Sequence, residues 1–384
     1  MKNIIFWGGY TTHMFELIVS MIKLGYNVKV IRYTNCANEK RTERIPQYPN
    51  NNMEDIIECN NINKALQICR QYDKRTTLHI NSCIKVSKSP LFIALKYLLT
   101  NGYNVISIPQ EGFQLQGIKG KLNYLKWCFY LNLTWRRNMT AWGVTGLNAY
   151  RQFRICGIKK EKLFQFLYVT KQNNISSSYS RYGAENKKLK FIYVGAIDKR
   201  KNIVPVVKLM QELYSKYDYE FNIYGSWSLD DELRQLVAND KHIFYHGKQP
   251  YETVREQMMH ADYLILPSLY DGYGAVGNEG LQSGCKLIIS KQSGCSVFPR
   301  IHKELGYEFD ARDEYSLQVV LDACFAAGPL TISRKKKIVE WANDNISPNA
   351  VAGYFEQIIN HYFNGQTKPI APWLSIKQQD NYGK

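Results

Sequence analysis

The chain has 384 residues, 45% hydrophobic and 13% aromatic, which is enough for two domains with full cores. No run approaches the roughly 20 apolar residues that span a bilayer, and no secretory signal is evident, so we expect a cytoplasmic protein. The net charge is +17, and residues 1–170 hold most of it, with 24 Lys and Arg against 9 Asp and Glu. That excess favours an acidic partner for the first half: an anionic membrane, a phosphorylated acceptor or nucleic acid. A merely basic surface is the alternative.

The first half reads as alternating strands and helices. The pattern predicts strands at 3–7, 27–31, 77–80 and 104–108, and helices at 14–24 and 91–99. Continuous β-branched runs that alternate with helices are typical of a parallel sheet covered on both faces.

A polar, repetitive stretch at 171–190 is the best linker candidate, and a second alternation follows it. We predict strands at 191–194, 220–224, 243–245, 263–266 and 285–290, and helices at 203–216, 229–238, 251–260 and 349–363. The sequence thus predicts two doubly wound domains that face each other across a cleft. Their expected bounds are 1–170 for the first domain and 171–348 for the second, and we expect a helix and irregular tail at 349–384 to pack back on the first domain.

Nine cysteines show no CxxC pair and no spacing typical of zinc ligands. Because their number is odd and several lie in apolar runs, buried free thiols in a reducing compartment are favoured over disulfides or zinc. No Asp-x-Asp metal motif is present, and we expect neither a metal nor a cofactor.

The loop after the strand at 263–266 is the most informative segment. It carries two carboxylates, Asp271 and Glu279, with Gly272, Gly274 and Gly277 between them. A strand, a glycine loop and a helix present backbone N–H groups to a phosphate, whereas carboxylates suit hydroxyls. The loop therefore predicts a ligand with diphosphate and polyol parts, as in a nucleotide sugar.

A second loop follows the strand at 191–194. It begins at Gly195 and brings Lys199, Arg200 and Lys201 to the start of a helix, where three cations repel unless an anion lies there. A diphosphate satisfies them, and a guanidinium matches its geometry. A solvated basic turn is the alternative.

These two loops resemble the signature of the family 4 (group 1) retaining glycosyltransferases of the GT-B fold. That signature has a glycine after the first strand of the C-terminal domain, a lysine six positions later, and then E-x7-E. Here the glycine is Gly195, the lysine is Lys201, and the last motif reads Asp271-x7-Glu279. The resemblance also covers the Ile223-Tyr-Gly225 stretch. Ala196 stands where the family has an arginine, and Asp271 replaces a glutamate.

The resemblance implies roles for these residues. Lys201, with Arg200 or Lys199, would neutralise the departing diphosphate, and Glu279 would bind the ribose hydroxyls. Gly225 would complete the donor site. The residues that would hold the sugar are Asp271, Gly272, Tyr273, Gly274, Ala275 and Val276. Positive charge and N–H dipoles would stabilise the leaving group without a metal.

The first half is expected to bind the acceptor. Gly8 and Gly9 end the first strand, where they could approach the donor phosphate or simply form a turn. His13 could orient a hydroxyl or cap a helix. Glu111 could be a base near the acceptor or a local ion pair. His79, on an alternating strand, is favoured as a core residue.

Residues 119–137 interleave aromatic side chains with lysine and arginine. This mixture suits an anionic membrane interface, and a core helix with basic flanks is an equal alternative. Nucleic acid is a weaker hypothesis, because no recognition motif accompanies these residues.

We therefore expect a peripheral-membrane glycosyltransferase at the inner face of the membrane. It would transfer a hexose-type sugar from a UDP- or GDP-sugar to a glycan acceptor, lipid-diphosphate-linked, in surface polysaccharide assembly. A sugar-nucleotide epimerase of the same fold and a non-catalytic subunit are the alternatives.

Overall fold

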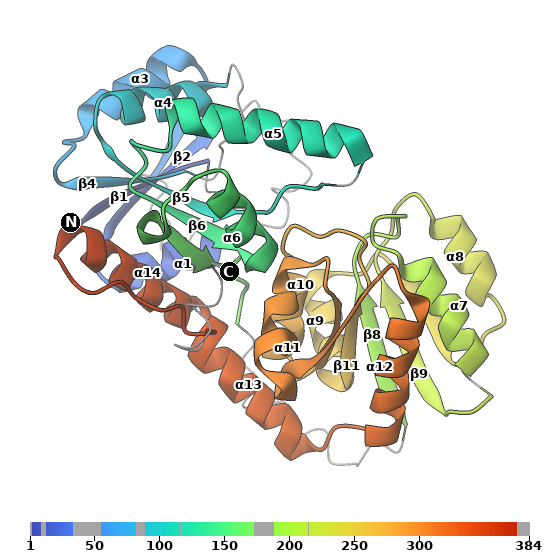
Figure 1. Ribbon diagram of the computed structural model, residues 1–384. Coiled ribbons are helices and arrows are strands. Elements are labelled where there is room, and N and C mark those ends of the chain that lie inside the picture. Colours follow the sequence, from blue (N-terminus) through green and yellow to red (C-terminus); the bar gives the residue numbers. More distant parts are fainter. Residues whose placement is uncertain are drawn as a thin grey trace. The chain divides into compact units, whose positions relative to one another are not determined.

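The structure is a computed structural model that describes residues 2–8, 13–33, 55–81, 89–115, 117–172, 188–213 and 215–374. The chain divides into two compact units, residues 1–170 with 348–384 and residues 171–347. Both are drawn in Figure 1. Gly9, most of the predicted linker and residues 375–384 of the predicted tail lie outside the described residues.

The first unit is built on a parallel sheet of seven strands in the order β3-β2-β1-β4-β5-β6-β7. The strands are β1 Asn3–Trp7, β2 Asn27–Tyr33, β3 Ile56–Cys59, β4 Thr77–Asn81, β5 Asn104–Gln110, β6 Ala141–Thr145 and β7 Leu163–Phe166. The helices are α1 Phe15–Lys23, α3 Ile62–Gln71, α4 Pro90–Thr100, α5 Gly117–Thr134, α6 Gly146–Ile155 and α14 Pro348–Phe363.

Helices cover both faces of this sheet (Figure 1). Along β1, Ile5 and Trp7 point into the core that α3, α4 and α6 share. The last helix, α14, packs beside α1. Its Phe355 meets the ring of Phe166 on β7 at 5.8 Å between centroids. The end of the chain thus packs on the first unit, beside α1 and against β7.

The described part of the tail after α14 has no helix or strand, yet it is packed. Trp373 is buried against Tyr354 of α14, with ring centroids 5.5 Å apart. The Lys368 ammonium donates a hydrogen bond to the carbonyl of Leu163 at 3.0 Å. Burial lowers the pKa of Lys368 to about 8. Packing rather than regular backbone hydrogen bonding therefore holds this segment.

The second unit has a parallel sheet of six strands in the order β10-β9-β8-β11-β12-β13. The strands are β8 Leu189–Val194, β9 Tyr219–Tyr224, β10 Ile243–Gly247, β11 Tyr263–Leu266, β12 Lys286–Ser290 and β13 Gly306–Phe309. The helices are α7 Ile203–Leu213, α8 Asp230–Val237, α9 Tyr251–His260, α10 Val276–Gln282, α11 Val297–Ile301, α12 Glu314–Ala327 and α13 Ile332–Ile346.

The structure confirms two doubly wound parallel-sheet domains. Three predicted elements have the observed bounds: the strands at 3–7 and 263–266 and the helix at 251–260. Several elements were not predicted, namely β3, α3, β6, α6, β7, β13, α11, α12 and α13. His79 is a core residue, as favoured, because it is fully buried and its Nδ1 accepts a hydrogen bond from the Trp7 indole at 3.0 Å.

One expectation about the cysteines is wrong. Cys128 of α5 and Cys156, directly after α6, form a disulfide. The two residues are 28 positions apart and carry no motif, so only the packing of these helices brings them together. The free cysteines among the described residues are all buried, as predicted. They are Cys59, Cys69, Cys285, Cys295 and Cys324. Cys36 and Cys83 lie outside the described residues.

Among the described residues, no helix is both long enough and apolar enough to cross a membrane.

A buried carboxylate joins three segments of the second unit. Asp262, just before β11, is 2% exposed. It accepts hydrogen bonds from the backbone N–H groups of Lys190 at 2.9 Å and Leu330 at 3.0 Å, and lies 3.6 Å from the Lys335 ammonium. Strand β8, the start of α13 and the turn before β11 are thus tied to one side chain.

We expect Asp262→Ala to lower the free energy of unfolding of the second unit by about 3 to 5 kcal/mol, because it leaves the buried Lys335 ammonium without a counter-charge and two N–H groups without an acceptor. Urea unfolding followed by tryptophan fluorescence measures this. Asp344→Ala removes an exposed aspartate of α13 and is the matched control, with a change below about 0.5 kcal/mol. Similar small changes for both variants would contradict the assigned role of Asp262.

Candidate functional site

In the second unit, the strand order reverses between β8 and β11. The chain runs from β8 outward to β10 and then returns to β11 on the other side of β8. Ile192 pairs with Leu264, so both strands end two residues further on, side by side. Ligands of doubly wound sheets bind at such a point, beyond the carboxyl ends of the strands. The two loops singled out in the sequence are the loops that leave this point.

These two loops are joined by an ion pair between the Lys201 ammonium and the Asp271 carboxylate. Both side chains are largely buried, 13% and 12% exposed. A tight turn directs Lys201, whose backbone N–H donates to the Asp198 carboxylate at 2.7 Å. Asn202 completes the turn with a φ of 59°. The family-signature lysine and the first carboxylate, 70 residues apart, therefore form one site.

The loop around Asp271 is held by the segment after β12. The Asp271 N–H donates to the carbonyl of Gln292 at 3.2 Å, and the Asp271 carbonyl accepts from the Gly294 N–H at 3.2 Å. The Cys295 N–H donates to the Tyr273 carbonyl at 2.7 Å. Backbone bonds thus fix the loop, so Asp271 is held in position whether or not its side chain is paired.

The glycines of this loop are needed where the backbone passes close to its neighbours. Gly274 has a φ of 88°, and a Cβ there would lie 2.7 Å from Leu266 Cδ2 and 2.9 Å from Cys295 Sγ. Within the described residues, the backbone N–H groups of Ala275 and Val276 have no acceptor. The loop therefore offers two donors beside a lysine, although the following helix, α10, is only seven residues long.

Glu279 lies on α10 and is separate from the ion pair. Its carboxylate accepts a hydrogen bond from the Tyr251 hydroxyl at 3.4 Å, at the start of α9. Burial, together with the charge of Glu279, raises the pKa of Tyr251. The structure thus gives the two carboxylates different surroundings: Asp271 faces a cation and Glu279 faces a phenol.

The remaining cations of the first loop differ in their contacts. Arg200 donates to the carbonyl of Tyr270 at 3.1 Å and lies 4.0 Å from the Asp198 carboxylate, so it braces one loop against the other. Lys199 is exposed, and no contact of its side chain occurs in the described part of the chain. The predicted repulsion among three cations is therefore partly relieved by Asp198 and Asp271.

Gly195 and Gly225 lie where the loops after β8 and β9 touch. Gly225 has a φ of 131°, and a Cβ there would lie 1.7 Å from the Gly195 carbonyl oxygen. The Gly195 N–H donates to the Tyr224 carbonyl at 3.0 Å. Beside them, the Tyr193 hydroxyl donates to the carbonyl of Ala196 at 2.7 Å. These contacts fix the position of the loop that begins at Gly195 and leads to Lys201.

In the first unit, the corresponding reversal lies between β1 and β4. Gly8 directly follows β1 with a φ of 68°, and its N–H donates to the Ile31 carbonyl at 3.0 Å. A Cβ at this position would lie 2.9 Å from Leu91 Cδ1. The structure thus assigns Gly8 a structural turn, which leaves its approach to a phosphate as a prediction.

His13 and Glu111 are brought together by a residue that the sequence did not single out. The His13 ring stacks on the Tyr168 ring, with centroids 4.5 Å apart. The Tyr168 hydroxyl donates to the Glu111 carboxylate at 2.7 Å. Tyr168 follows β7 and belongs to no motif, so nothing in the sequence indicated it. Glu111 follows β5, which places both side chains at the carboxyl ends of their strands.

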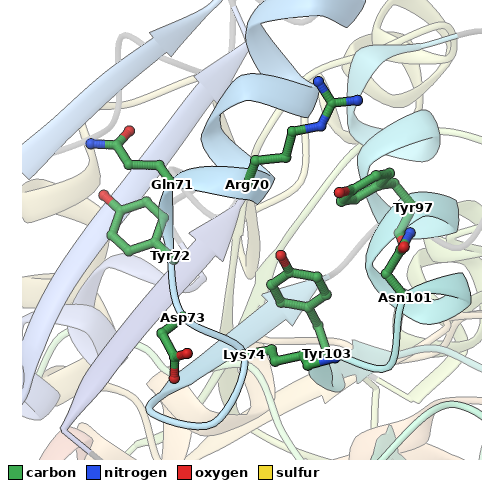
Figure 2. Close-up of a pocket in the computed structure, with 8 residues that line it drawn as sticks. All are labelled: Arg70, Gln71, Tyr72, Asp73, Lys74, Tyr97, Asn101 and Tyr103. Carbon is green, nitrogen blue, oxygen red and sulfur yellow. The ribbon is translucent and has the colours of Figure 1, made fainter.

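A polar hollow of about 480 Å³ lies elsewhere in the first unit, where α3 and α4 end and β4 and β5 begin (Figure 2). The guanidinium of Arg70 lies over the ring of Tyr97 there, 5.6 Å from its centroid. This is the edge of the sheet opposite to Gly8 and Glu111, so the hollow is separate from the candidate site. In the described part of the chain, no group of three His, Cys, Asp or Glu side chains could hold a metal ion.

A comparison with known families finds a match in the second unit of the chain. Residues 177–315 match the model of the family "Glycosyl transferases group 1". The chain is similar to this family over that range, which lies within its second unit. The match includes Lys201, Asp271 and Glu279.

Two curated relatives come from Methanocaldococcus jannaschii. "Uncharacterized glycosyltransferase MJ1607" is 24% identical over 29% of this chain and 30% of its own length. "Uncharacterized glycosyltransferase MJ1178" is 24% identical over 27% of this chain and 29% of its own length. Each match thus spans less than a third of the relative's length.

Solved glycosyltransferase structures share the fold over nearly the whole chain. Anabaena Alr3699/HepE, solved with UDP, is 12% identical with a TM-score of 0.68, covering 94% of this chain and 100% of that one. The lipopolysaccharide outer core galactosyltransferase WaaB gives 13% identity and a TM-score of 0.65, with 95% and 100% covered. A glycosyltransferase from Rickettsia africae gives 15% identity and a TM-score of 0.65, with 95% and 99% covered. These likenesses establish the GT-B fold.

The close approach of Gly225 to Gly195 gives a test of how tightly the loops after β8 and β9 pack. We expect Gly225→Ala to destabilise the second unit by about 2 kcal/mol or more, because a Cβ is strained at this φ and clashes with a carbonyl. Gly353→Ala is the matched control. It lies inside α14, where a Cβ meets nothing within 4 Å, so it should stabilise by about 0.5 to 1 kcal/mol.

Urea unfolding of both variants measures the two effects. Opposite signs are expected, and equal midpoints for both variants would contradict the strain assigned to Gly225.

Proposed function

We propose that this protein is a retaining glycosyltransferase that moves a hexose-type sugar from a UDP- or GDP-sugar to a glycan acceptor. The acceptor is a glycan linked to a lipid diphosphate, and the reaction serves surface polysaccharide assembly at the inner face of the membrane. The observation that carries the proposal is the Lys201–Asp271 ion pair at the strand-order reversal of the second sheet.

The chemistry of glycosyl transfer explains why a lysine belongs there. As the glycosidic bond breaks, positive charge develops on the sugar and negative charge on the departing diphosphate. An ammonium held in a largely buried position stabilises that negative charge more than one in water does. We propose that Lys201 takes this role, helped by Arg200, by Lys199 and by the N–H groups of Ala275 and Val276.

Asp271 and Glu279 then have separate tasks. Asp271 lies on the loop with Gly272, Tyr273 and Gly274, and we propose that it accepts hydrogen bonds from sugar hydroxyls once a diphosphate shares the Lys201 charge. Glu279 already accepts a hydrogen bond from the Tyr251 hydroxyl at 3.4 Å. We propose that it also accepts hydrogen bonds from the ribose hydroxyls. Hydroxyl donors suit carboxylates, which accept hydrogen bonds only. Gly195 and Gly225 shape the loops around the donor.

The acceptor side of the proposal rests on the first unit. Glu111 accepts a hydrogen bond from Tyr168, whose ring stacks on that of His13, and it lies at the carboxyl ends of the strands, where the substrates of such sheets bind. We propose that His13 and Glu111 orient the acceptor hydroxyl and that Gly8 and Gly9 adjoin the donor phosphate. In a retaining reaction, the acceptor attacks on the face that the nucleotide leaves.

The similar structures suggest which donors to test first. HepE was solved with UDP-glucose and with UDP and glucose, and WaaB is named a galactosyltransferase of the lipopolysaccharide outer core. UDP-glucose and UDP-galactose are therefore the first donors, followed by GDP-mannose. The excess of positive charge in residues 1–170 supports an anionic membrane as the partner surface.

We expect Lys201→Ala to lower the rate of nucleotide release at saturating donor by about 10²- to 10³-fold, because one preorganised charge on the leaving group is lost. Released UDP or GDP is measured with and without a membrane-extract acceptor. Lys208→Ala removes an exposed lysine of α7 and is the matched control, with near wild-type turnover.

Near-normal turnover of the Lys201 variant would refute its role. Formation of an epimer without acceptor would replace the proposal by an epimerase. No turnover of the wild type with any donor would favour a non-catalytic subunit.

We expect Tyr168→Phe to raise the KM for the acceptor about tenfold, since it removes the hydroxyl that positions the Glu111 carboxylate. Slow nucleotide release without acceptor should stay unchanged, and so should the KM for the donor. Initial-rate kinetics with varied donor and acceptor separates these values. Tyr97→Phe, in the hollow at the opposite edge of the sheet, is the matched control. An equal rise in both KM values would mean a structural rather than a positioning role.

A further inference from the structure

Helix α5 has two apolar faces, and only one of them is packed. On the inner face, the Trp127 ring meets those of Phe113 at 4.2 Å and Phe153 at 5.1 Å. The Tyr124 hydroxyl donates to the Gln152 carbonyl at 2.7 Å. Together with the disulfide from Cys128, these contacts hold the helix firmly on the first unit.

The outer face of α5 carries large apolar side chains that are exposed in the described part of the chain. Four of them are between 58% and 80% exposed. They are Ile118, Leu122, Leu125 and Phe129, and we call them the α5 stripe. Their spacings of four, three and four residues place them on one line along the helix, about 16 Å long. Contiguous apolar surface of this kind on a soluble domain marks an interaction site.

Lysines border the stripe on both sides. At about 100° per residue, Lys119 and Lys126 lie on one flank and Lys121 on the other. The printed sequence has no aspartate or glutamate between Glu111 and Glu161. The helix therefore combines an apolar line, cationic flanks and no negative charge.

We propose that the α5 stripe docks the first unit on an anionic lipid surface, with the helix lying in the plane of the interface. The four apolar side chains enter the boundary between headgroups and acyl chains, and the three lysines reach lipid phosphates while their stems cover apolar surface. The proposal deepens the membrane part of the proposed function, because it names the surface and requires apolar insertion as well as attraction of charge.

Two other binding partners for the α5 stripe fit the observations less well. A second copy of this chain would set Lys119, Lys121 and Lys126 against the same lysines, and like charges brought together cost energy. Nucleic acid would satisfy the lysines but would leave four aliphatic and aromatic side chains against phosphate and water. Only a surface with an apolar interior and anionic headgroups matches both the α5 stripe and the lysines that flank it.

Vesicle cosedimentation of the full chain tests whether the α5 stripe docks on an anionic lipid surface. Vesicles of phosphatidylglycerol and phosphatidylcholine are compared with phosphatidylcholine alone, at low and at high salt. We expect Leu125→Ser/Phe129→Ser, which leaves the charge unchanged, to weaken binding to the anionic vesicles at least about tenfold. Lys119→Glu/Lys126→Glu should weaken it at low salt mainly.

The matched control is Tyr315→Ser/Val319→Ser, which changes two exposed apolar residues four apart on α12. It should bind vesicles like the wild type. Circular dichroism and thermal unfolding confirm that each variant is folded. Donor turnover in the absence of membranes should be unchanged in every variant, so a failure of glycosyl transfer is distinguishable from a failure of docking.

Two results would overturn the proposal. One is wild-type vesicle binding by Leu125→Ser/Phe129→Ser. The other is a dimer of the wild type in sedimentation that this variant abolishes, because the stripe would then bind a second copy.

Discussion

The ion pair between Lys201 and Asp271 depends on the strand order of the second sheet, and much of that unit serves to position it. A lysine and an aspartate 70 residues apart meet only because β8 and β11 are neighbours. Glycines let the backbones approach closely enough: Gly225 passes the Gly195 carbonyl, and Gly294 passes that of Gly272. Without a substrate, the carboxylate neutralises the ammonium. In the function proposed above, a diphosphate would share the Lys201 charge with Asp271, so the site never holds a bare buried ammonium, which would be costly to keep.

The first unit also places polar side chains at the carboxyl ends of its parallel strands, but these side chains are of a different kind. Where the second unit holds a cation, this one holds a carboxylate, an imidazole and a phenol in contact through Tyr168. Its core also includes the end of the chain, since α14 packs beside α1 and against β7, and Trp373 is buried against α14. The same unit carries the positive charge and the exposed α5 stripe. The function proposed above thus assigns acceptor binding and surface attachment to the first unit, and donor binding to the second.

Periodicity predicted elements well where one residue pattern dominated. The strand at 263–266 and the helix at 251–260 are observed as predicted. Short or mixed segments were missed: β6 has only five residues and contains Gly143, and α13 has three successive lysines, 335–337, in its first half. Among the site residues, Lys201 and Asp271 were identified from their motifs, but their direct contact was not. Tyr168 and the pairing of Cys128 with Cys156 had no local signal at all, because both depend on which elements pack together.

The sequence by itself determined the two parallel-sheet domains, the residue types in the loops after β8 and β11, and the uneven distribution of charge. These follow from local rules: alternation of strands and helices, glycine where the chain turns, and a count of charged side chains. Only the tertiary structure decided that Asp271 neutralises Lys201, that Glu279 faces Tyr251, and that α5 packs one apolar face while leaving the other bare. Those facts concern residues far apart in the chain, and the sheet order that brings them together is a property of the whole fold and not of any one segment.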